Sequence, residues 1–334
     1  MIALVADTTH ARERDALTRL RVARVAVPAP KRGEVLVRVA AAPCNPADLY
    51  YLCGRYGIDR PLPATPGFEG AGTVVASGGG LLARYMNGKR VACGGHAGSG
   101  TWAEYAIVPA DSCFPLARDV TLEQGAAALA NPTTALALLS LAKRGRHRAF
   151  ISTAAAGQLG RMIVVEARAR RLAGIHVVRR AEQAAQLREL GAEHVLVSTS
   201  DAFDRELAAL AAKLGATIAY DAVAGAMTGR LLAAMPSHGE VVVYGALSGE
   251  PCGGIDAMAL AFGEKRVRGF EIEGHAREIG LFATFRLATA AQKRVRAGTF
   301  TTTIRDRVPL ADAPARLAAY VDNMSEGKLL IVPS

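Results

Sequence analysis

The pattern of apolar and polar residues changes twice along the chain and divides it into three stretches. In the first stretch, up to about residue 115, short β-branched runs such as Glu34–Val39, Gly72–Val75 and Tyr105–Val108 are separated by turns rich in Pro and Gly. Runs of this length between such turns are typical of strands. We therefore predict that the first stretch is all-β.

The middle stretch, from about residue 122, alternates strands with helices. Two helices open it, at Leu122–Leu129 and Thr133–Ala142. The predicted strands are Ala149–Thr153, Ile175–Val178, His194–Val197, Thr217–Tyr220 and Val241–Tyr244. The predicted helices between and after them are Gly157–Ala173, Ala181–Leu190, Asp201–Leu214 and Ala226–Met235. This alternation predicts an α/β domain with a doubly wound parallel sheet and helices on both faces.

The last stretch reverts to the first pattern near residue 265. It predicts a strand, two helices and a final strand, at Arg266–Ile272, Ala276–Ala297, Leu310–Asn323 and Leu329–Val332. A β-rich lobe thus brackets an inserted α/β domain. We place the divisions at residues 1–120, 121–268 and 269–334, with the third segment completing the first.

Composition narrows the class of protein. The 334 residues carry a formal net charge of +10, but Lys and Arg are scattered, so we predict no nucleic-acid partner and instead a small-molecule substrate. No apolar run approaches the length of a membrane span, and the first residues lack the order of a signal peptide. The five cysteines form no C-x-x-C pair, which favours free thiols in a reducing cytoplasm.

The segment from Ala149 to Arg180 carries the most specific chemistry. Its turn, Ala154-x-x-Gly157-x-x-Gly160, lies between a predicted strand and a predicted helix, which is the context that a dinucleotide-binding turn requires. Small side chains let the backbone approach a pyrophosphate, and the helix N-terminus offers unpaired N–H groups. The expected pyrophosphate-binding residues are Ala155, Ala156, Gly157, Gln158 and Leu159.

The end of the next predicted strand indicates which dinucleotide binds. An NAD site usually places an acid there, whereas this strand ends in Arg179-Arg180, with no acid before Glu182. Two guanidinium groups suit a 2′-phosphate, so we predict NADP(H). The alternative is a solvated basic start of a helix.

Short motifs in a fixed order resemble a known family. They are Ala42–Asp48, Pro66–Gly72, Gly100–Ala106, Asn131–Thr134, the glycine turn, Leu190–His194, Asp221–Val223, Val243–Leu247 and Gly327–Lys328. The chain resembles the medium-chain dehydrogenase/reductase superfamily, in its zinc-free branch of quinone oxidoreductases and enoyl thioester reductases. The resemblance implies a GroES-like β-rich catalytic domain and a Rossmann cofactor domain.

Zinc-dependent members of that superfamily would place their ligands at Asn45, Phe68 and near Ala130, where no side chain suits zinc. Cys44 lies one position off and is expected to be a small buried thiol. We therefore expect no metal. Without a Lewis acid an alkoxide lacks its usual stabilisation, which favours a reductase over an alcohol dehydrogenase.

The resemblance to enoyl thioester reductases implies that Tyr56, in Gly54-Arg55-Tyr56, is the catalytic donor. A packing tyrosine is the alternative reading, and Tyr50 and Tyr51 compete for the role. Asn45 is expected to form a hydrogen bond near the nicotinamide or, alternatively, to cap the following turn. Asp48 is expected to be a structural cap.

The remaining cofactor residues also follow from the resemblance and from their place after strands. Thr134 is expected near the nicotinamide, or as a helix N-cap. The turn after the fifth predicted strand and the lysine before the last strand complete the set, namely Tyr244, Gly245, Ala246, Leu247 and Lys328. Trp102 is expected in the core of the β-rich lobe or in a pocket wall.

Two expectations concern the segment from Lys265 to His275. As an uncovered edge strand, Lys265–Ile272 predicts a homodimer, as in relatives. The acids and the histidine in Phe270–His275 suit a small or polar acceptor, unless the segment is a solvated loop.

The predicted function is NADPH-dependent reduction of quinones or activated alkenes, including enones and enoyl thioesters. The alternatives are a zinc-free alcohol or aldehyde oxidoreductase and a non-enzymatic NADPH-binding module. The sequence leaves the acceptor open.

Overall fold

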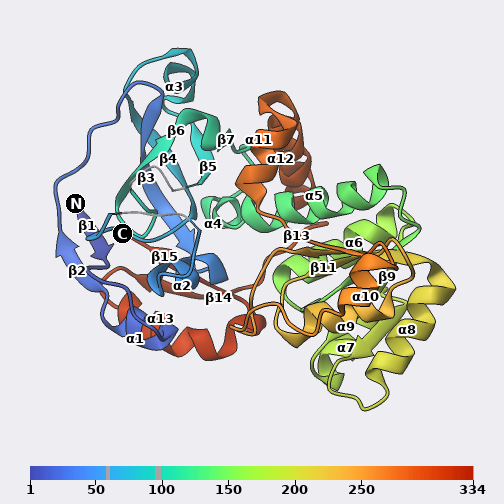
Figure 1. The fold of residues 1–334 in the computed structure, drawn as a ribbon. Coiled ribbons are helices and arrows are strands. Elements are labelled where there is room, and N and C mark those ends of the chain that lie inside the picture. The colour runs from blue at the N-terminus through green and yellow to red at the C-terminus, as the bar shows by residue number, and fades with distance from the viewer. Residues whose placement is uncertain (58–60, 95–98, 334) are drawn as a thin grey trace. The chain divides into compact units, whose positions relative to one another are not determined.

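The computed structural model describes residues 1–57, 61–94 and 99–333, and the chain forms two compact units (Figure 1). Unit 1 contains Met1–Ala130 and Ala288–Ser334, and unit 2 contains Asn131–Leu287. The divisions thus fall at 130/131 and 287/288, later than the predicted 120/121 and 268/269. They shift because helix α4 (Leu122–Ala126) belongs with unit 1, whereas helix α11 (Ile272–Ile279) and the start of α12 (Leu281–Arg296) belong with unit 2.

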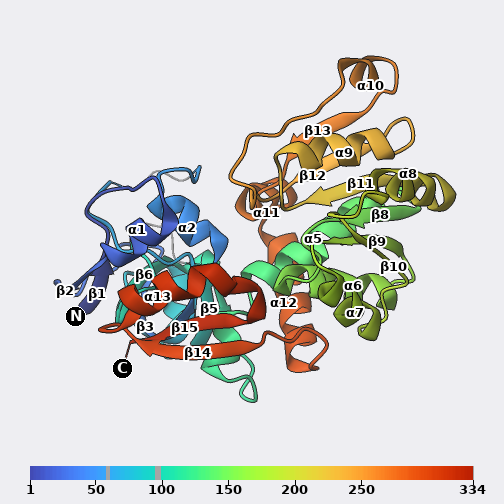
Figure 2. The same ribbon diagram turned by 90° about the horizontal axis from the view of Figure 1, so that it is seen from below.

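The sheet of unit 2 has six strands in the order β10-β9-β8-β11-β12-β13, and every neighbouring pair is parallel (Figure 2). The strands are β8 (Ala149–Ser152), β9 (Ala173–Val178), β10 (His194–Val197), β11 (Ala216–Asp221), β12 (Glu240–Val243) and β13 (Arg266–Gly269). In chain order this is 3-2-1-4-5-6, the dinucleotide-binding order, which reverses between β8 and β11. The prediction of a doubly wound parallel sheet is confirmed.

Alternation along β9 sends its side chains to two separate cores. Ile175 and Val177 pack with one pair of helices, α8 (Phe203–Leu214) and α9 (Ala226–Ala234). Val178 packs with the pair on the other face, α6 (Gln158–Ala169) and α7 (Ala181–Glu189). Because both faces of the sheet are covered, its central strands β8, β9 and β11 are nearly continuous apolar runs, as the sequence pattern shows.

The helices that follow β12 differ from the sequence prediction. The remaining helix bounds are α5 (Ala130–Arg144), α10 (Ala257–Ala261), α11 (Ile272–Ile279) and α12 (Leu281–Arg296). The single helix predicted at Ala276–Ala297 is two helices, separated at Gly280, whose φ of 80° a helix cannot accommodate. Strand β13 ends at Gly269, before the predicted Ile272.

Unit 1 holds a seven-stranded sheet in the order β14-β15-β3-β4-β5-β7, with β6 also paired to β3. Its strands are β3 (Glu34–Pro43), β4 (Glu69–Ser77), β5 (Arg90–Gly94), β6 (Tyr105–Pro109), β7 (Cys113–Pro115), β14 (Ile304–Pro309) and β15 (Lys328–Val332). A separate antiparallel pair is formed by β1 (Ile2–Val5) and β2 (Arg21–Arg24). Strands β14 and β15, from the end of the chain, thus lie in the same sheet as the strands of the first stretch.

Short helices interrupt the first stretch, which the sequence pattern predicted as all-β. They are α1 (Glu13–Thr18), α2 (Pro46–Leu52) and α3 (Leu81–Met86), with α4 (Leu122–Ala126) and α13 (Ala313–Tyr320) later in the unit. Strand β14 was missed, because its alternate charged residues, in IRDRVP, hide it from a search for apolar runs. Among the residues that the structure describes, no helix is both long enough and apolar enough to span a membrane.

Candidate functional site

In the turn between β8 and α6, the backbone of Gly160 lies very close to the backbone of Ala155. A Cβ on Gly160 would lie 2.3 Å from the carbonyl oxygen of Ala155, so only glycine fits there. Ala154 adopts a φ of 49°, and the N–H of Ala155 donates to the oxygen of Val177 at 3.1 Å. These contacts fold the turn tightly over the carboxyl end of β9.

The start of α6 leaves hydrogen-bond donors unused. Gly157 is the N-cap residue and has no side chain with which to cap the helix. The N–H groups of Gln158, Leu159 and Gly160 have no acceptor within the helix, because they belong to its first turn. Together with the helix dipole, they form a site suited to an anion such as a pyrophosphate.

Arg179 and Arg180 follow β9 directly, at the same edge of the sheet as this turn. Both are exposed, and their backbone N–H groups donate to Oε1 of Gln183 at 3.2 and 3.1 Å. Over the described ranges, neither guanidinium group has a hydrogen-bond or ion-pair partner. The two cations are thus available to a phosphate, which they can bind through paired N–H donors.

The segment Tyr244–Leu247 is tied to the carboxyl end of β11. Tyr244 N–H donates to the carbonyl oxygen of Asp221 at 2.8 Å, and Leu247 N–H donates to that of Ala222 at 3.0 Å. A Cβ on Gly245 would lie 2.8 Å from the oxygen of Ala222, so the segment approaches β11 closely. This puts it at the point where the strand order reverses, which is where α/β sheets bind ligands.

The carboxylate of Asp221 shapes this edge of the sheet. It is fully buried and accepts from the hydroxyl groups of Thr153 at 3.0 Å and Thr228 at 2.8 Å. It also accepts from the N–H groups of Val223 and Ala224. The sequence shows Asp221 only as part of a family motif, because nothing in the local pattern reveals that these partners converge on it.

Thr134 lies inside α5, four residues after the helix begins at Ala130, and is partly buried. It is therefore not the N-cap that the sequence offered as an alternative. Its expected contact with the nicotinamide remains a prediction.

In unit 1, a chain of buried polar groups joins residues that are far apart in the sequence. Lys328 Nζ donates to Oδ1 of Asn45 and, at 3.3 Å, to the carbonyl oxygen of Cys44. Asn45 Nδ2 donates to Glu69 at 3.0 Å. The other oxygen of Glu69 accepts from the N–H groups of Leu129 at 3.0 Å and Ala130 at 2.8 Å.

The neighbours of Asn45 fix which way its amide faces. Lys328 can only donate, so it must meet the amide oxygen, whereas ionised Glu69 can only accept, so it must meet the NH₂ group. One N–H of that NH₂ group is used by Glu69, which leaves the second as a donor of defined direction. Asn45 stands at the N-cap position of α2, but its side chain binds Glu69 and Lys328 instead.

Asp48 supplies the cap of α2, as the sequence indicated. Its carboxylate accepts from the N–H of Asn45 at 2.7 Å and from the N–H of Phe68 at 2.9 Å. Burial raises the pKa of Asp48 to about 6, although these two hydrogen bonds act in the opposite direction.

Burial also disfavours the charged forms of Glu69 and Lys328. It raises the pKa of Glu69, against the N–H of Ala130 and the amide of Asn45, which lower it. It lowers the pKa of Lys328, against the raising effect of Glu69. Each charge therefore depends on the other for its presence in an apolar lobe.

Phe68 stands at one of the positions where a zinc-dependent relative would have a ligand, and its ring packs against two tyrosine rings. The ring of Phe68 lies with its centroid 4.9 Å from that of Tyr56 and 5.6 Å from that of Tyr51. Tyr56 is partly buried and Tyr51 is buried. Trp102 is fully buried and donates to the carbonyl oxygen of Pro43 at 3.2 Å, so it is a core residue.

The polar residues of Phe270–His275 belong to a helix end in unit 2. Glu271 is the N-cap of α11, and its carboxylate accepts from the N–H groups of Glu273 and Gly274. His275 is buried, with its ring 5.3 Å from that of Phe270. The segment is therefore the start of a helix and not a solvated loop, and the expectation that its acids and histidine suit a small or polar acceptor remains a prediction.

Neither the role of Glu69 nor the contact between Asn45 and Lys328 was predicted from the sequence. The available signal for Glu69 was a single carboxylate at the start of an apolar strand, Glu69-Gly-Ala-Gly-Thr-Val-Val. The hydrogen-bond partners of that carboxylate come from the residues at the start of α2 and α5, and a local pattern carries no information on such distant contacts.

Comparison with known proteins agrees with a two-part, nucleotide-dependent oxidoreductase. Residues 31–118 match the model of the alcohol dehydrogenase GroES-like domain, and residues 159–284 match the model described as zinc-binding dehydrogenase. The chain is 34% identical to a protein described as an NADPH:quinone reductase from Mesorhizobium loti, with a TM-score of 0.92 and coverage of 100% of this chain and 98% of that one.

Two further relatives define the branch. A mycobacterial quinone oxidoreductase solved with NADPH is 27% identical, with a TM-score of 0.83 and full coverage of both chains. The mitochondrial enoyl-[acyl-carrier-protein] reductase of Xenopus tropicalis is 33% identical over 185 residues, which are 53% of this chain and 51% of that protein. The chain thus spans about half the length of the curated relatives that it matches.

The chain belongs to the medium-chain dehydrogenase/reductase superfamily, in its quinone oxidoreductase and enoyl reductase-like branch. The predicted pairing of a GroES-like domain with a Rossmann domain is confirmed.

The buried chain of unit 1 predicts strong coupling between Lys328 and Glu69. Lys328→Met should lower the free energy of unfolding by about 3–5 kcal/mol, because it leaves a buried carboxylate without its cation. In the double variant Lys328→Met/Glu69→Gln, the side-chain amide of Asn45 can rotate by half a turn. Its oxygen then accepts a hydrogen bond from the amide that replaces the Glu69 carboxylate. Urea unfolding should therefore show a loss smaller than the sum of the two single losses by about 1–3 kcal/mol. Losses that add to within about 0.5 kcal/mol would contradict the coupling.

Proposed function

We propose that this protein is a zinc-independent, NADPH-dependent oxidoreductase that reduces quinones or activated alkenes, such as enones and enoyl thioesters, by hydride transfer. The observation that carries the proposal is the pair of unpartnered guanidinium groups of Arg179 and Arg180 beside the turn at Gly157 and Gly160. The relatives described as NADPH:quinone reductases and enoyl reductases support the same reaction class.

The residues of unit 2 fit NADP(H) in shape and charge. In this proposal the pyrophosphate binds the backbone of the turn and of the start of α6, at Ala155, Ala156, Gly157, Gln158 and Leu159. Gly160 has no side chain, which lets the first turn of α6 lie close to the backbone of Ala155. The 2′-phosphate binds Arg179 and Arg180. Thr134, Tyr244, Gly245, Ala246 and Leu247 complete the proposed cofactor-binding set in unit 2, and Lys328 is the proposed cofactor-binding residue of unit 1.

The residues at the zinc positions do not fit a metal. The amide oxygen of Asn45 accepts from Lys328, the ring of Phe68 packs on Tyr56, and Ala130 offers only a methyl group. In the described ranges 1–57, 61–94 and 99–333, no three His, Cys, Asp or Glu side chains gather as a metal site would require. The nearby carboxylate of Glu69 is occupied by Asn45 and two backbone N–H groups.

In the proposed reaction NADPH supplies the hydride, and the chain supplies position and hydrogen-bond donors. Asn45 offers its remaining N–H in a direction set by Glu69 and Lys328. Tyr56, held by its ring against Phe68, is the proposed donor to the acceptor, because a phenol is neutral at pH 7 and can donate a proton. The pre-set direction of the Asn45 donor avoids reorganisation during the reaction.

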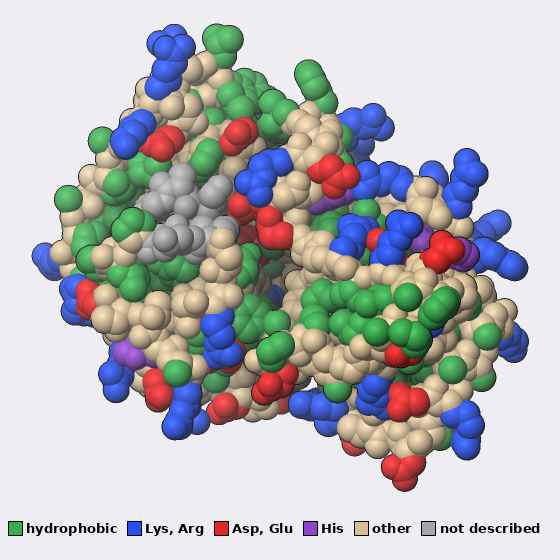
Figure 3. Space-filling view, viewed as in Figure 1, with side chains coloured by type: hydrophobic (Ala, Val, Ile, Leu, Met, Phe, Trp, Pro, Cys, Tyr) green, Lys and Arg blue, Asp and Glu red, His purple; other side chains and the backbone are tan. Residues whose placement is uncertain are grey.

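We further propose a homodimer in a reducing cytoplasm. Strand β13 is the last strand of its sheet, and α10 beside it exposes apolar side chains, with Met258 56% and Phe262 82% exposed. Figure 3 shows hydrophobic side chains gathered in the region of α10. A second copy of the chain would cover such an edge. The free thiols of Cys44, Cys93 and Cys113, all buried, support a reducing compartment.

A screen of acceptors tests the proposed function. NADPH oxidation should be catalysed with quinones, enones or enoyl thioesters, and it should persist after chelation of metals. Turnover with aldehydes alone would favour the alcohol or aldehyde oxidoreductase. Tight NADPH binding without turnover of any acceptor would favour a non-enzymatic module.

The double variant Arg179→Ala/Arg180→Ala tests the cofactor assignment. It should weaken NADPH binding by about 2–4 kcal/mol, since each hydrogen bond to a charged group contributes roughly 1.5–3 kcal/mol. NADH, which lacks the 2′-phosphate, should bind as before. Calorimetric titration of both nucleotides measures this, with Arg205→Ala, an exposed arginine on α8, as the control. Equal losses for NADPH and NADH would refute the assignment.

Tyr56→Phe tests the catalytic donor. With an activated alkene, kcat should fall roughly 10²-fold, a typical loss for one donor that acts in the transition state. With a quinone, kcat should change little, because the hydroquinone anion takes its proton from water. NADPH affinity should stay unchanged, and Tyr85→Phe, at a position that is 60% exposed, serves as the matched control. A wild-type rate with every acceptor would reduce Tyr56 to a packing residue.

The proposed dimer predicts a mass of two chains by light scattering at micromolar concentration. The variant Leu260→Glu/Phe262→Glu, which places charge on the apolar surface of α10, should shift the mass to one chain. Leu81→Glu, at a position that is 90% exposed in unit 1, should leave the dimer intact. A monomeric wild-type protein would contradict the proposal.

A further inference from the structure

Unit 2 contains a cavity at the edge of the sheet opposite to the proposed cofactor site. Its volume is about 320 Å³, and it lies between the C-terminal half of α6 and the first residues of β9 and β10. The glycine turn and the arginine pair lie at the other ends of α6 and β9. A molecule in this cavity would therefore not occupy the NADP(H) site.

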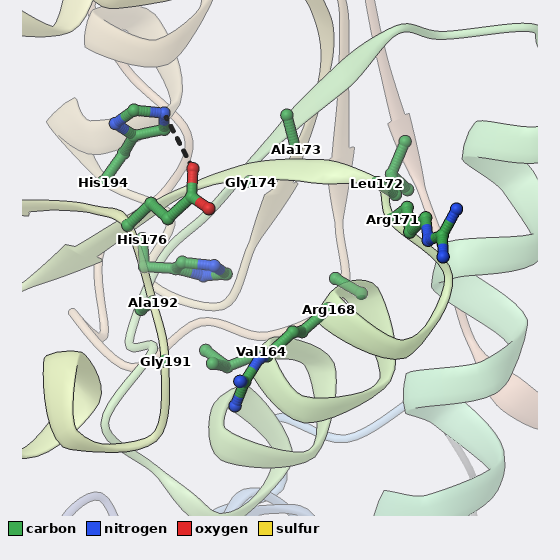
Figure 4. A pocket seen from close by; sticks show the side chains of 12 residues that line it. Val164, Arg168, Arg171, Leu172, Ala173, Gly174, His176, Gly191, Ala192 and His194 are labelled. Carbon is green, nitrogen blue, oxygen red and sulfur yellow. Dashed lines mark ion pairs between the residues drawn. The ribbon is translucent and has the colours of Figure 1, made fainter.

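The floor of the cavity presents an unpartnered ring nitrogen. His176 is 3% exposed, and its Nδ1 lies 2.9 Å from Oγ of Ser152. Figure 4 shows its ring pointing into the space between β9 and α6. In the part of the chain that the structure describes, Nε2 has no hydrogen-bond partner. A Cβ on Gly174 would lie 2.8 Å from Nε2, so the missing side chain of this glycine keeps the nitrogen accessible.

Burial keeps this imidazole neutral at physiological pH, because it lowers the pKa of His176 to about 4. Nε2 therefore meets a neutral polar group of a ligand, such as a hydroxyl, and not a buried charge. Around it the lining is apolar, with Val164, Ala167, Leu172 and Ala192. The inner part of the cavity thus suits an apolar body with one hydrogen-bonding oxygen.

The rim of the cavity is cationic. Arg168 and Arg171, from the end of α6, both line it, and neither has an ion-pair partner among the described residues. Arg168 Nη1 lies 2.7 Å from where a Cβ on Gly191 would be, so this glycine gives the guanidinium its place at the wall. The one acid of the rim, Glu193, lies 4.0 Å from His194. The rim thus suits an anionic group.

We propose that this cavity binds a small organic anion, with a carboxylate at Arg168 and Arg171, an apolar body against α6 and a hydroxyl at Nε2 of His176. A built polar floor, an apolar wall and an unpaired cationic rim together specify all three parts of such a ligand. The inference is independent of the proposed function, because it uses none of the residues assigned to the reaction.

Titration of the protein with para-hydroxybenzoate, by calorimetry in the presence of saturating NADPH, tests the proposal. Saturable binding is expected, with no displacement by NADPH. Benzoate, which lacks the hydroxyl, and para-hydroxybenzyl alcohol, which lacks the charge, should each bind more weakly. Competition with NADPH, the absence of saturable binding, or equal affinity for all three probes would overturn the proposal.

Matched variants locate the site. Arg168→Glu should weaken binding of para-hydroxybenzoate about tenfold or more, the effect expected from losing one charge-assisted hydrogen bond. Arg205→Glu makes the same charge change at an exposed site on α8 and should alter affinity less than about twofold. Both positions are exposed, so neither variant removes a core contact. Equal losses in the two variants would overturn the assignment of the ligand to this cavity.

Discussion

The carboxylate of Glu69 is the constraint on which the arrangement of unit 1 depends. It begins β4, accepts from the N–H groups that open α5, and receives the amide of Asn45 at the start of α2. Through Asn45 it is connected to Lys328 on β15, more than two hundred residues later in the chain. A buried carboxylate must have its hydrogen bonds satisfied, so these elements are required to meet at one point.

The same requirement gives Asn45 its chemical value. An amide with free rotation presents donor and acceptor without preference, whereas one held between a lysine and a glutamate has a single orientation. Its remaining N–H is thereby directed before any ligand arrives, which is the kind of preorganisation that hydride transfer to an electron-poor carbon needs. In unit 2, a steric constraint has the parallel role, since the contact between Gly160 and Ala155 O sets the shape of the proposed pyrophosphate site.

Most strands of unit 2 could be predicted from the sequence because they are apolar runs between glycine-rich or polar turns. His194–Val197 was predicted to the residue, and the glycine turn and Arg179-Arg180 were visible as local motifs. The features that could not be predicted depend on the backbone conformation of one residue, on charged residues within a strand, or on partners far away in the sequence. Gly280 splits a helix whose pattern is continuous, β14 carries charges on alternate residues, and Glu69 finds its partners through the tertiary structure. The pairing of Asn45 with Lys328 arises in the same way, although both residues had been singled out separately.

A structure determined with NADPH bound would show whether the two units of binding chemistry described for the nucleotide are right. We expect the pyrophosphate to accept hydrogen bonds from the first N–H groups of α6, and the 2′-phosphate to lie within hydrogen-bond distance of Arg179 and Arg180. A 2′-phosphate that points to solvent, away from both guanidinium groups, would refute the assignment of NADP(H) to this site.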